Sequence, residues 1–257
     1  MFKKTGKKPF YSITIVCCAE KKESDYFNEL KKRCIRKRLK VIYENNTYGS
    51  TGGSYNQVCN TAIDIKKGLL VEYLSDALTS SSNITNKSDF NDLLHELGIL
   101  VQDIDLIDYR YFEILQLTRI ASFIEDFKID DEVCIVTDVD HFESDIVNRR
   151  KDCEDAKIDV YISNPCFEVW LYYKFYDTKP SSNSIFLDSS KSKATNFKNY
   201  LANKIKGGVN TIEVANSTYI NYAIDHSRKN LEYNSNNIPD IFSTNLSELC
   251  NKIIKYM

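Results

Sequence analysis

The chain has 257 residues, of which 42% are hydrophobic and 27% charged, so it can bury a full core as one large domain or two small ones. This composition excludes a disordered or a fibrous protein. The 34 basic and 36 acidic residues give a formal net charge of -2, so the chain as a whole carries no basic signature for nucleic acid. Because no apolar run approaches the ~18 to 20 residues of a membrane span, the sequence predicts a cytoplasmic protein that does not bind membranes.

Basic charge is concentrated near the start of the chain. Residues 1–40 contain thirteen basic and four acidic residues, a local balance of +9. Such a cluster fits either an edge that faces a polyanion or the solvated face of a lysine-rich helix. The candidates for contact with a nucleic acid are Lys31, Lys32, Arg33, Arg36, Lys37, Arg38 and Lys40.

The first elements predict a parallel sheet. Residues 12–18 form a short β-branched run without polar alternation, which is typical of a strand covered on both faces. Ser24 is a candidate N-cap for a helix that ends in the basic cluster at 36–40, and residues 41–43 restart a strand. This strand, helix and strand unit implies a right-handed crossover. A Gly/Ser-rich loop at 48–55, read as a connection, then leads into a helix at about 57–74.

The second half continues the alternation of strands and helices. Strands are predicted at 132–137 and 158–162, with helices at 142–156, 166–176, 198–206, 214–231 and 245–257. Asn245 and Glu248 resemble a capping box at the start of the last helix. The fold class is therefore α/β, with residues 1–74 and 128–257 as the core and residues 75–127 as a helical insertion.

The strand at 132–137 leads into the most informative segment. Asp138 and Asp140 follow it at positions i and i+2, and we expect their carboxylates to face the same side and bind one hard cation. The alternative is that they cap the next helix. His141 is a candidate acid, base or phosphate contact, although a histidine in a turn has many structural roles.

Further acids could complete a Mg²⁺ site. Glu20 and Glu23 lie in the loop that follows the first strand, and strands that carry such loops lie close together in parallel sheets. Glu168 stands among apolar and aromatic residues, so it is either exposed on a thin outer face or buried with a partner, which would be a metal ion or Asn164.

The eight cysteines show no spacing typical of zinc ligands, and most have apolar neighbours. We therefore expect reduced cysteines in the core. A nucleophilic role for Cys18 is disfavoured because the sequence places no histidine beside it to lower its pKa.

Three blocks together resemble the RloB family, small Toprim-type proteins found among bacterial anti-phage loci. They are IVCCAEKKESDYF at 15–27, VCIVTDVDHF at 133–142 and ISNPCFEVWLYYKF at 162–175. The resemblance implies a Toprim-like, mostly parallel α/β fold. It also implies a nuclease that depends on Mg²⁺ or Mn²⁺ and acts on RNA, including tRNA, or on DNA. An ATPase of the RloA or OLD kind is the implied partner, and a homodimer is left open.

Carried over by position, Asp138 and Asp140 match the family's second acidic motif, and Ser163, Asn164 and Glu168 match its third block. The first motif departs from the family pattern because Cys18 stands where a metal-binding or basic glutamate is usual. A thiol is a poor ligand for a hard cation. Either Glu20 or Glu23 completes the site, or the protein is a catalytically silent Toprim-fold subunit that binds an ATPase and acts as a sensor.

Overall fold

The computed structural model describes residues 12–18, 21–34, 39–44, 55–80, 132–140, 142–186, 188–205, 209, 215, 217–255 and 257. These residues form an α/β structure around a five-stranded sheet in the order β2-β1-β3-β4-β5. Four strands are parallel, and β5 is antiparallel to β4. The predicted α/β class is confirmed. The strands are β1 (Ile13–Cys18), β2 (Leu39–Glu44), β3 (Glu132–Asp138), β4 (Asp159–Asn164) and β5 (Ser243–Thr244).

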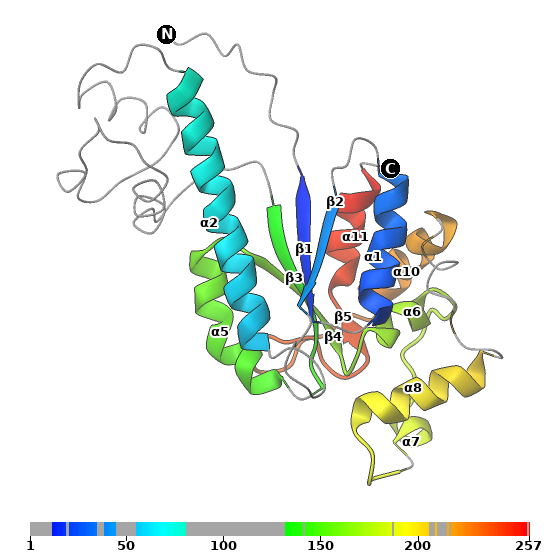
Figure 1. Ribbon diagram of the computed structural model, residues 1–257. Helices are drawn as coiled ribbons and strands as arrows, with labels where there is room; N and C mark the ends of the chain where they lie inside the picture. Colours follow the sequence, from blue (N-terminus) through cyan, green and yellow to red (C-terminus); the bar gives the residue numbers. More distant parts are fainter. Residues whose placement is uncertain are drawn as a thin grey trace.

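Helices cover both faces of the sheet, which explains the apolar runs of β1 and β3. On one face α2 (Tyr55–Ser80) and α5 (Glu143–Asp155) pack against Val16 and Ile135. On the other face α1 (Lys21–Arg33), α10 (Ser217–Lys229) and α11 (Leu246–Ile254) pack against Ile15 and Val136. Figure 1 shows these two helical layers to the left and right of the strands.

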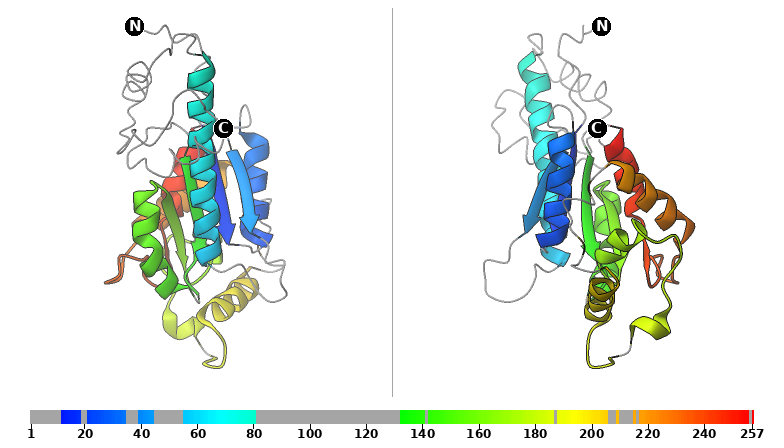
Figure 2. Two further views of the ribbon diagram at one scale, coloured as in Figure 1. Left: turned by 60° about the vertical axis from the view of Figure 1, so that its left-hand side comes forward. Right: turned by 90° about the vertical axis from the view of Figure 1, so that its right-hand side faces the viewer.

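A third cluster extends the core past one end of the strands. It joins α6 (Glu168–Tyr173), α7 (Ser182–Ile185) and α8 (Lys193–Lys204), with Phe197 and Phe242 at its centre. In both views of Figure 2, α7 and α8 lie beyond one end of the sheet, while α2 projects past the other end. Helix α6 is buried along its whole length.

Two predictions about helix capping differ from the structure. Helix α1 begins at Lys21, so Ser24 lies buried in the first turn and is not the N-cap. Asn245 does precede α11, but its side chain makes no capping hydrogen bond. It instead accepts a hydrogen bond from Ile162 N at 2.6 Å and donates one to Val160 O at 3.2 Å, so it binds the backbone of β4. Strand β5, which ends just before Asn245, has only two residues, so the Asn245 side chain supplies backbone hydrogen bonds to β4 that a longer strand would supply.

Other boundaries also differ from the predictions. The helix predicted to end at 36–40 is shorter, because α1 stops at Arg33, and Lys40 lies on β2. Residues 75–80 belong to α2, and the remainder of the predicted insertion lies outside the described residues. Within the described part of the chain, no helix is long and apolar enough to span a membrane.

Candidate functional site

The carboxyl ends of β3 and β4 lie side by side at one edge of the sheet, and backbone hydrogen bonds connect the loops that follow them. Asp138, the last residue of β3, pairs in register with Ser163 of β4. Beyond the strands, Val139 N donates to Ser163 O at 3.0 Å and Asp140 N donates to Pro165 O at 3.1 Å. These bonds hold the two loops together, so the acidic segment after β3 lies against the start of α6.

Glu168 opens α6 with a buried side chain, of which only 4% is exposed. Its Oε1 atom accepts a hydrogen bond from Lys22 Nζ at 2.7 Å, and Lys22 lies in the first turn of α1. A buried carboxylate needs a partner of this kind, because desolvation without one would be costly. Glu168 is therefore buried and paired. Asn164, the other predicted partner, instead donates its amide to Pro239 O at 2.8 Å.

Cys166 shows that further charged groups meet at this edge. Burial raises the pKa of the Cys166 thiol well above its usual value, and the carboxylates of Glu168 and Asp138 raise this pKa further. Lys198 of α8 lowers the same pKa. We call this group the carboxyl-edge cluster. Its members are Lys22, Asp138, Cys166, Glu168 and Lys198.

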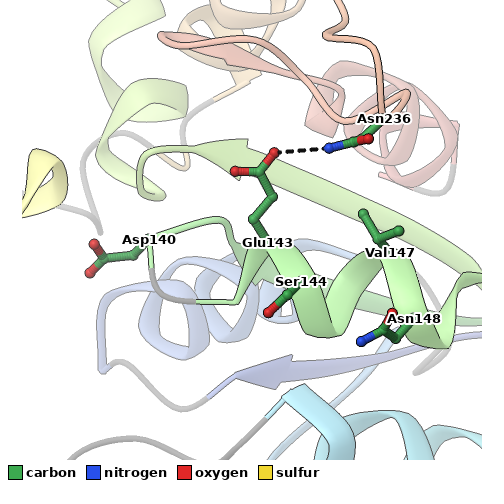
Figure 3. A pocket seen from close by; sticks show the side chains of 6 residues that line it. All are labelled: Asp140, Glu143, Ser144, Val147, Asn148 and Asn236. Atoms are coloured by element: carbon green, nitrogen blue, oxygen red, sulfur yellow. Dashed lines mark hydrogen bonds between the residues drawn. The ribbon is translucent and has the colours of Figure 1, made fainter.

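Asp140 occupies different surroundings from Asp138. It lies in the turn after β3 and borders an open cavity of about 620 Å³ along the first two turns of α5. In Figure 3 its carboxylate points away from Glu143, which instead accepts a hydrogen bond from Asn236 Nδ2 at 3.4 Å. The cavity is lined by Asp140, Glu143, Ser144, Val147, Asn148 and Asn236.

The first loop is only partly described. Glu23 is buried, with 1% exposure, in the first turn of α1, and Cys18 ends β1. The side chain of Cys18, together with Glu20 and His141, lies outside the described residues. Among the described residues, no group of three or more His, Cys, Asp and Glu side chains is arranged to hold a metal ion.

The donor chemistry of the cluster nevertheless suits Mg²⁺. This ion commonly uses one or two protein carboxylates and fills its other positions with water and substrate phosphate oxygens. Asp138 and Glu168 supply two such carboxylates at one edge. The predicted site residue Ser163 has a structural contact here, since its hydroxyl lies 2.9 Å from that of Thr244.

The described members of the predicted basic cluster lie at the opposite edge of the sheet. Helix α1 starts at the carboxyl edge and has 13 residues, which places its last turn ~18 Å away. There Lys31 is exposed, whereas Lys32 and Arg33 both form ion pairs with Glu29, at 2.8 Å and 3.7 Å. Lys40 lies at the start of β2, and the remaining members, Arg36, Lys37 and Arg38, fall outside the described residues.

Three members of the carboxyl-edge cluster were not predicted as site residues from the sequence. Lys22 counted only toward a general basic charge, Cys166 only as a core cysteine, and Lys198 only as the start of a helix. Sequence spacing could not indicate that Lys22 pairs with Glu168, because 146 positions separate the two residues. The one usable signal was Glu168 itself, a charge in an apolar helix that required a cationic partner.

The family model described as RloB-like protein matches residues 13–253. The chain belongs to the RloB-like family. This match confirms the family resemblance over nearly the whole chain. No curated protein and no solved structure matches it.

Proposed function

We propose that this RloB-like protein is a Mg²⁺-dependent nuclease of Toprim type that hydrolyses phosphodiester bonds in RNA or DNA. The observation that carries the proposal is the placement of Asp138 at the carboxyl end of β3, next to the loop that leads into α6, where the buried Glu168 pairs with Lys22. In parallel α/β sheets, ligands bind at this edge. Membership of the RloB-like family supports the same function.

The chain's own groups have separable roles in this proposal. Asp138 and Glu168 would hold the divalent ion, which when bound activates water and stabilises charge on the phosphodiester. Lys198 and the half-exposed Lys22 bind phosphate oxygens of the substrate. The Cys166 thiol stays protonated, because its pKa is raised.

Asp140 and the first loop extend the site. Asp140 sits next to the cluster in sequence and borders an open cavity, so it can serve water or substrate at the rim of the site. Glu20 and Glu23 remain the alternatives for a third acid. Glu23 already lies in the first turn of α1, one residue from Lys22.

The proposal includes a defence role. The effector would act against phage together with an ATPase of the RloA or OLD kind, as the family resemblance implies. A test is the gene neighbourhood, followed by copurification of the chain with the product of any adjacent ATPase gene. An ATPase that neither neighbours nor copurifies with the chain would count against this part alone.

The catalytic proposal is tested by incubating the purified protein with labelled tRNA, single-stranded DNA and double-stranded DNA, with Mg²⁺ or with EDTA. We expect cleavage of at least one substrate with Mg²⁺ only. Asp138→Asn should reduce it about 100-fold or more, since a lost charge contact in the transition state costs several kcal/mol. Asp155→Asn, which removes an exposed acid at the far end of α5, is the matched control and should cleave normally. Equal cleavage by both variants would refute the assignment.

A second candidate function is a catalytically silent subunit that binds an ATPase. The ion pair of Lys22 with Glu168 favours it, because the ammonium group occupies an oxygen that a metal ion would need. Calorimetry with Mn²⁺ separates the two functions. Binding that disappears in Asp138→Ala supports the nuclease, whereas no measurable binding by the wild-type protein supports the silent subunit.

A further inference from the structure

Two buried cysteines lie in contact between α2 and α5. The Sγ atoms of Cys59 and Cys153 are 3.7 Å apart, and both side chains are buried. A disulfide requires an S–S distance of about 2.05 Å, so the sulfur atoms need to approach by only about 1.7 Å. This contact lies on the face of the sheet covered by α2 and α5, outside the carboxyl-edge cluster.

Cys153 is almost fully buried, with 1% exposure, but it is one of the residues that line a cavity. The cavity has a volume of about 400 Å³ and is lined by Tyr55, Cys153, Ile146 and Ile162 on its apolar side and by Arg150 and Asn237 among its polar residues. Arg150 donates to Asn236 O at 2.8 Å and to Asn237 O at 3.1 Å, which holds one wall in place. A small neutral oxidant can enter such a cavity, whereas Cys59 does not line it.

We expect Cys153 to react first, because it lines the cavity and because its pKa is lowered. The hydrogen bond with Cys59 lowers the pKa of Cys153, while burial opposes this shift. The nearby guanidinium group of Arg149 lowers the pKa of both thiols. The same hydrogen bond and burial raise the pKa of Cys59. Arg149 is fixed by Asp152, 2.9 Å from its Nε, and by Asn60 Oδ1, 2.7 Å from its Nη2. The thiolate is the reactive form of cysteine, so this asymmetry favours attack by Cys153.

We propose that Cys59 and Cys153 are a peroxide-sensitive pair that forms a reversible disulfide between α2 and α5. Cys153 loses its proton, and its sulfur attacks one oxygen of hydrogen peroxide. The O–O bond breaks, which leaves a sulfenic acid and a hydroxide that takes the proton to become water. Cys59 sulfur then attacks the sulfenic sulfur, the S–O bond breaks, and the departing hydroxide leaves as a second water with the Cys59 proton. The two thiols are oxidised by two electrons, and one peroxide is reduced to two waters.

The disulfide would add a covalent bond between two helices that the reduced protein holds by packing and by the hydrogen bond from Arg149 to Asn60. Helix α5 begins three residues after Asp140, so its position determines the path of the acidic segment after β3. A cross-link at Cys153 would therefore fix α5 against α2 and, through α5, limit the movement of the acidic segment. Reduction by a cellular thiol would release it.

The test is made on the intact wild-type protein, first reduced and then exposed to hydrogen peroxide. Free thiols are blocked, the protein is digested, and cross-linked peptides are identified by mass spectrometry. We expect a peptide that joins Cys59 to Cys153, which disappears after dithiothreitol. Oxidation of Cys153 should be about tenfold faster than that of Cys134, which is buried with a strongly raised pKa.

Two single variants distinguish the chemistry from nonspecific oxidation. In Cys59→Ser, Cys153 should stop at the sulfenic acid and be trapped by dimedone, whereas Cys153→Ser should form neither the cross-link nor a sulfenic acid at Cys59. Cys34→Ser, which removes a half-buried cysteine of α1's end, should form the cross-link as the wild type does. The proposal is overturned if both thiols of the wild type stay free while Cys34 is oxidised, or if the cross-link forms only in protein denatured beforehand.

Discussion

Lys22 Nζ lies 2.7 Å from Glu168 Oε1, and this contact joins the first turns of α1 and α6. The two partners differ in environment, since the lysine side chain is 50% exposed and the glutamate side chain is 4% exposed. The carboxylate therefore depends on the lysine more than the lysine depends on the carboxylate. Removing the lysine would leave a buried carboxylate without its cationic partner, which is strongly unfavourable.

Lys22→Met should lower the free energy of unfolding by about 1 to 2 kcal/mol, because it leaves a buried carboxylate without this partner while solvent screens part of the loss. The double variant Lys22→Met/Glu168→Gln should recover much of that loss, since no buried charge then remains. Urea unfolding of the four proteins in the cycle measures the coupling. Lys31→Met, at the exposed far end of the same helix, serves as the control. Purely additive effects would contradict the coupling.

The Cys166 thiol should make the protein less stable in alkali. Its pKa is raised in the folded state, so above about pH 8.5 the unfolded chain loses this proton while the folded chain keeps it. The unfolded state then binds fewer protons, and the free energy of unfolding falls as the pH rises. Urea unfolding at pH 7 and pH 9.5 in a reducing buffer should show a shallower decline for Cys166→Ala than for the wild type. Identical slopes would contradict this prediction.

Asn245→Ala should destabilise the sheet by about 1 to 3 kcal/mol. The substitution removes the acceptor of Ile162 N and the donor to Val160 O, and it leaves partly buried backbone groups of β4 without these bonds. Asn236→Ala offers a matched comparison, because Asn236 is exposed and its side-chain contacts involve only surface groups. The midpoint of urea unfolding measures both. A capping role alone, as the sequence predicted, would predict full rescue by Asn245→Ser, which we do not expect.

The start of α8 should affect the position of Lys198. Ser192 is the N-cap of α8, and its hydroxyl accepts a hydrogen bond from Thr195 N at 3.1 Å. Ser192→Ala should cost about 1 kcal/mol, whereas Ser192→Asp should keep the cap. If Lys198 binds substrate phosphate, Ser192→Ala should also weaken nucleic-acid binding in a titration, and Ser192→Asp should not. Ser189→Ala, an exposed serine in the preceding turn, is the neutral control.

The strands were largely predictable from the sequence because β1 and β3 are covered on both faces. A short β-branched run such as residues 132–137 has few alternatives to a buried strand, and the structure extends it only to Asp138. Boundaries at polar residues were less predictable. Ser24 and Asn245 are both good N-cap residues in isolation, but tertiary contacts assign one to a buried turn and the other to a strand backbone.

The candidate site was predictable only in part, for a topological reason. Asp138 and Glu168 stand out because each is a charge at the end of an apolar segment. The cations that accompany them come from α1 and α8, and no local pattern indicates that these helices start at the same edge. Topology also explains why Lys31 lies far from the candidate site. A crossover helix that starts at the carboxyl edge ends at the opposite edge of the sheet, and Lys31 is in the last turn of α1.

The wide spacing of the carboxyl-edge cluster along the chain has a consequence for biosynthesis. Its members run from Lys22 to Lys198, so the pairing of β1 with β3 and the docking of α8 must both precede its completion. Contacts between such distant residues form late, because a long loop has to close before they are made. A nascent chain emerging from the ribosome therefore lacks this site until most of its length has been translated.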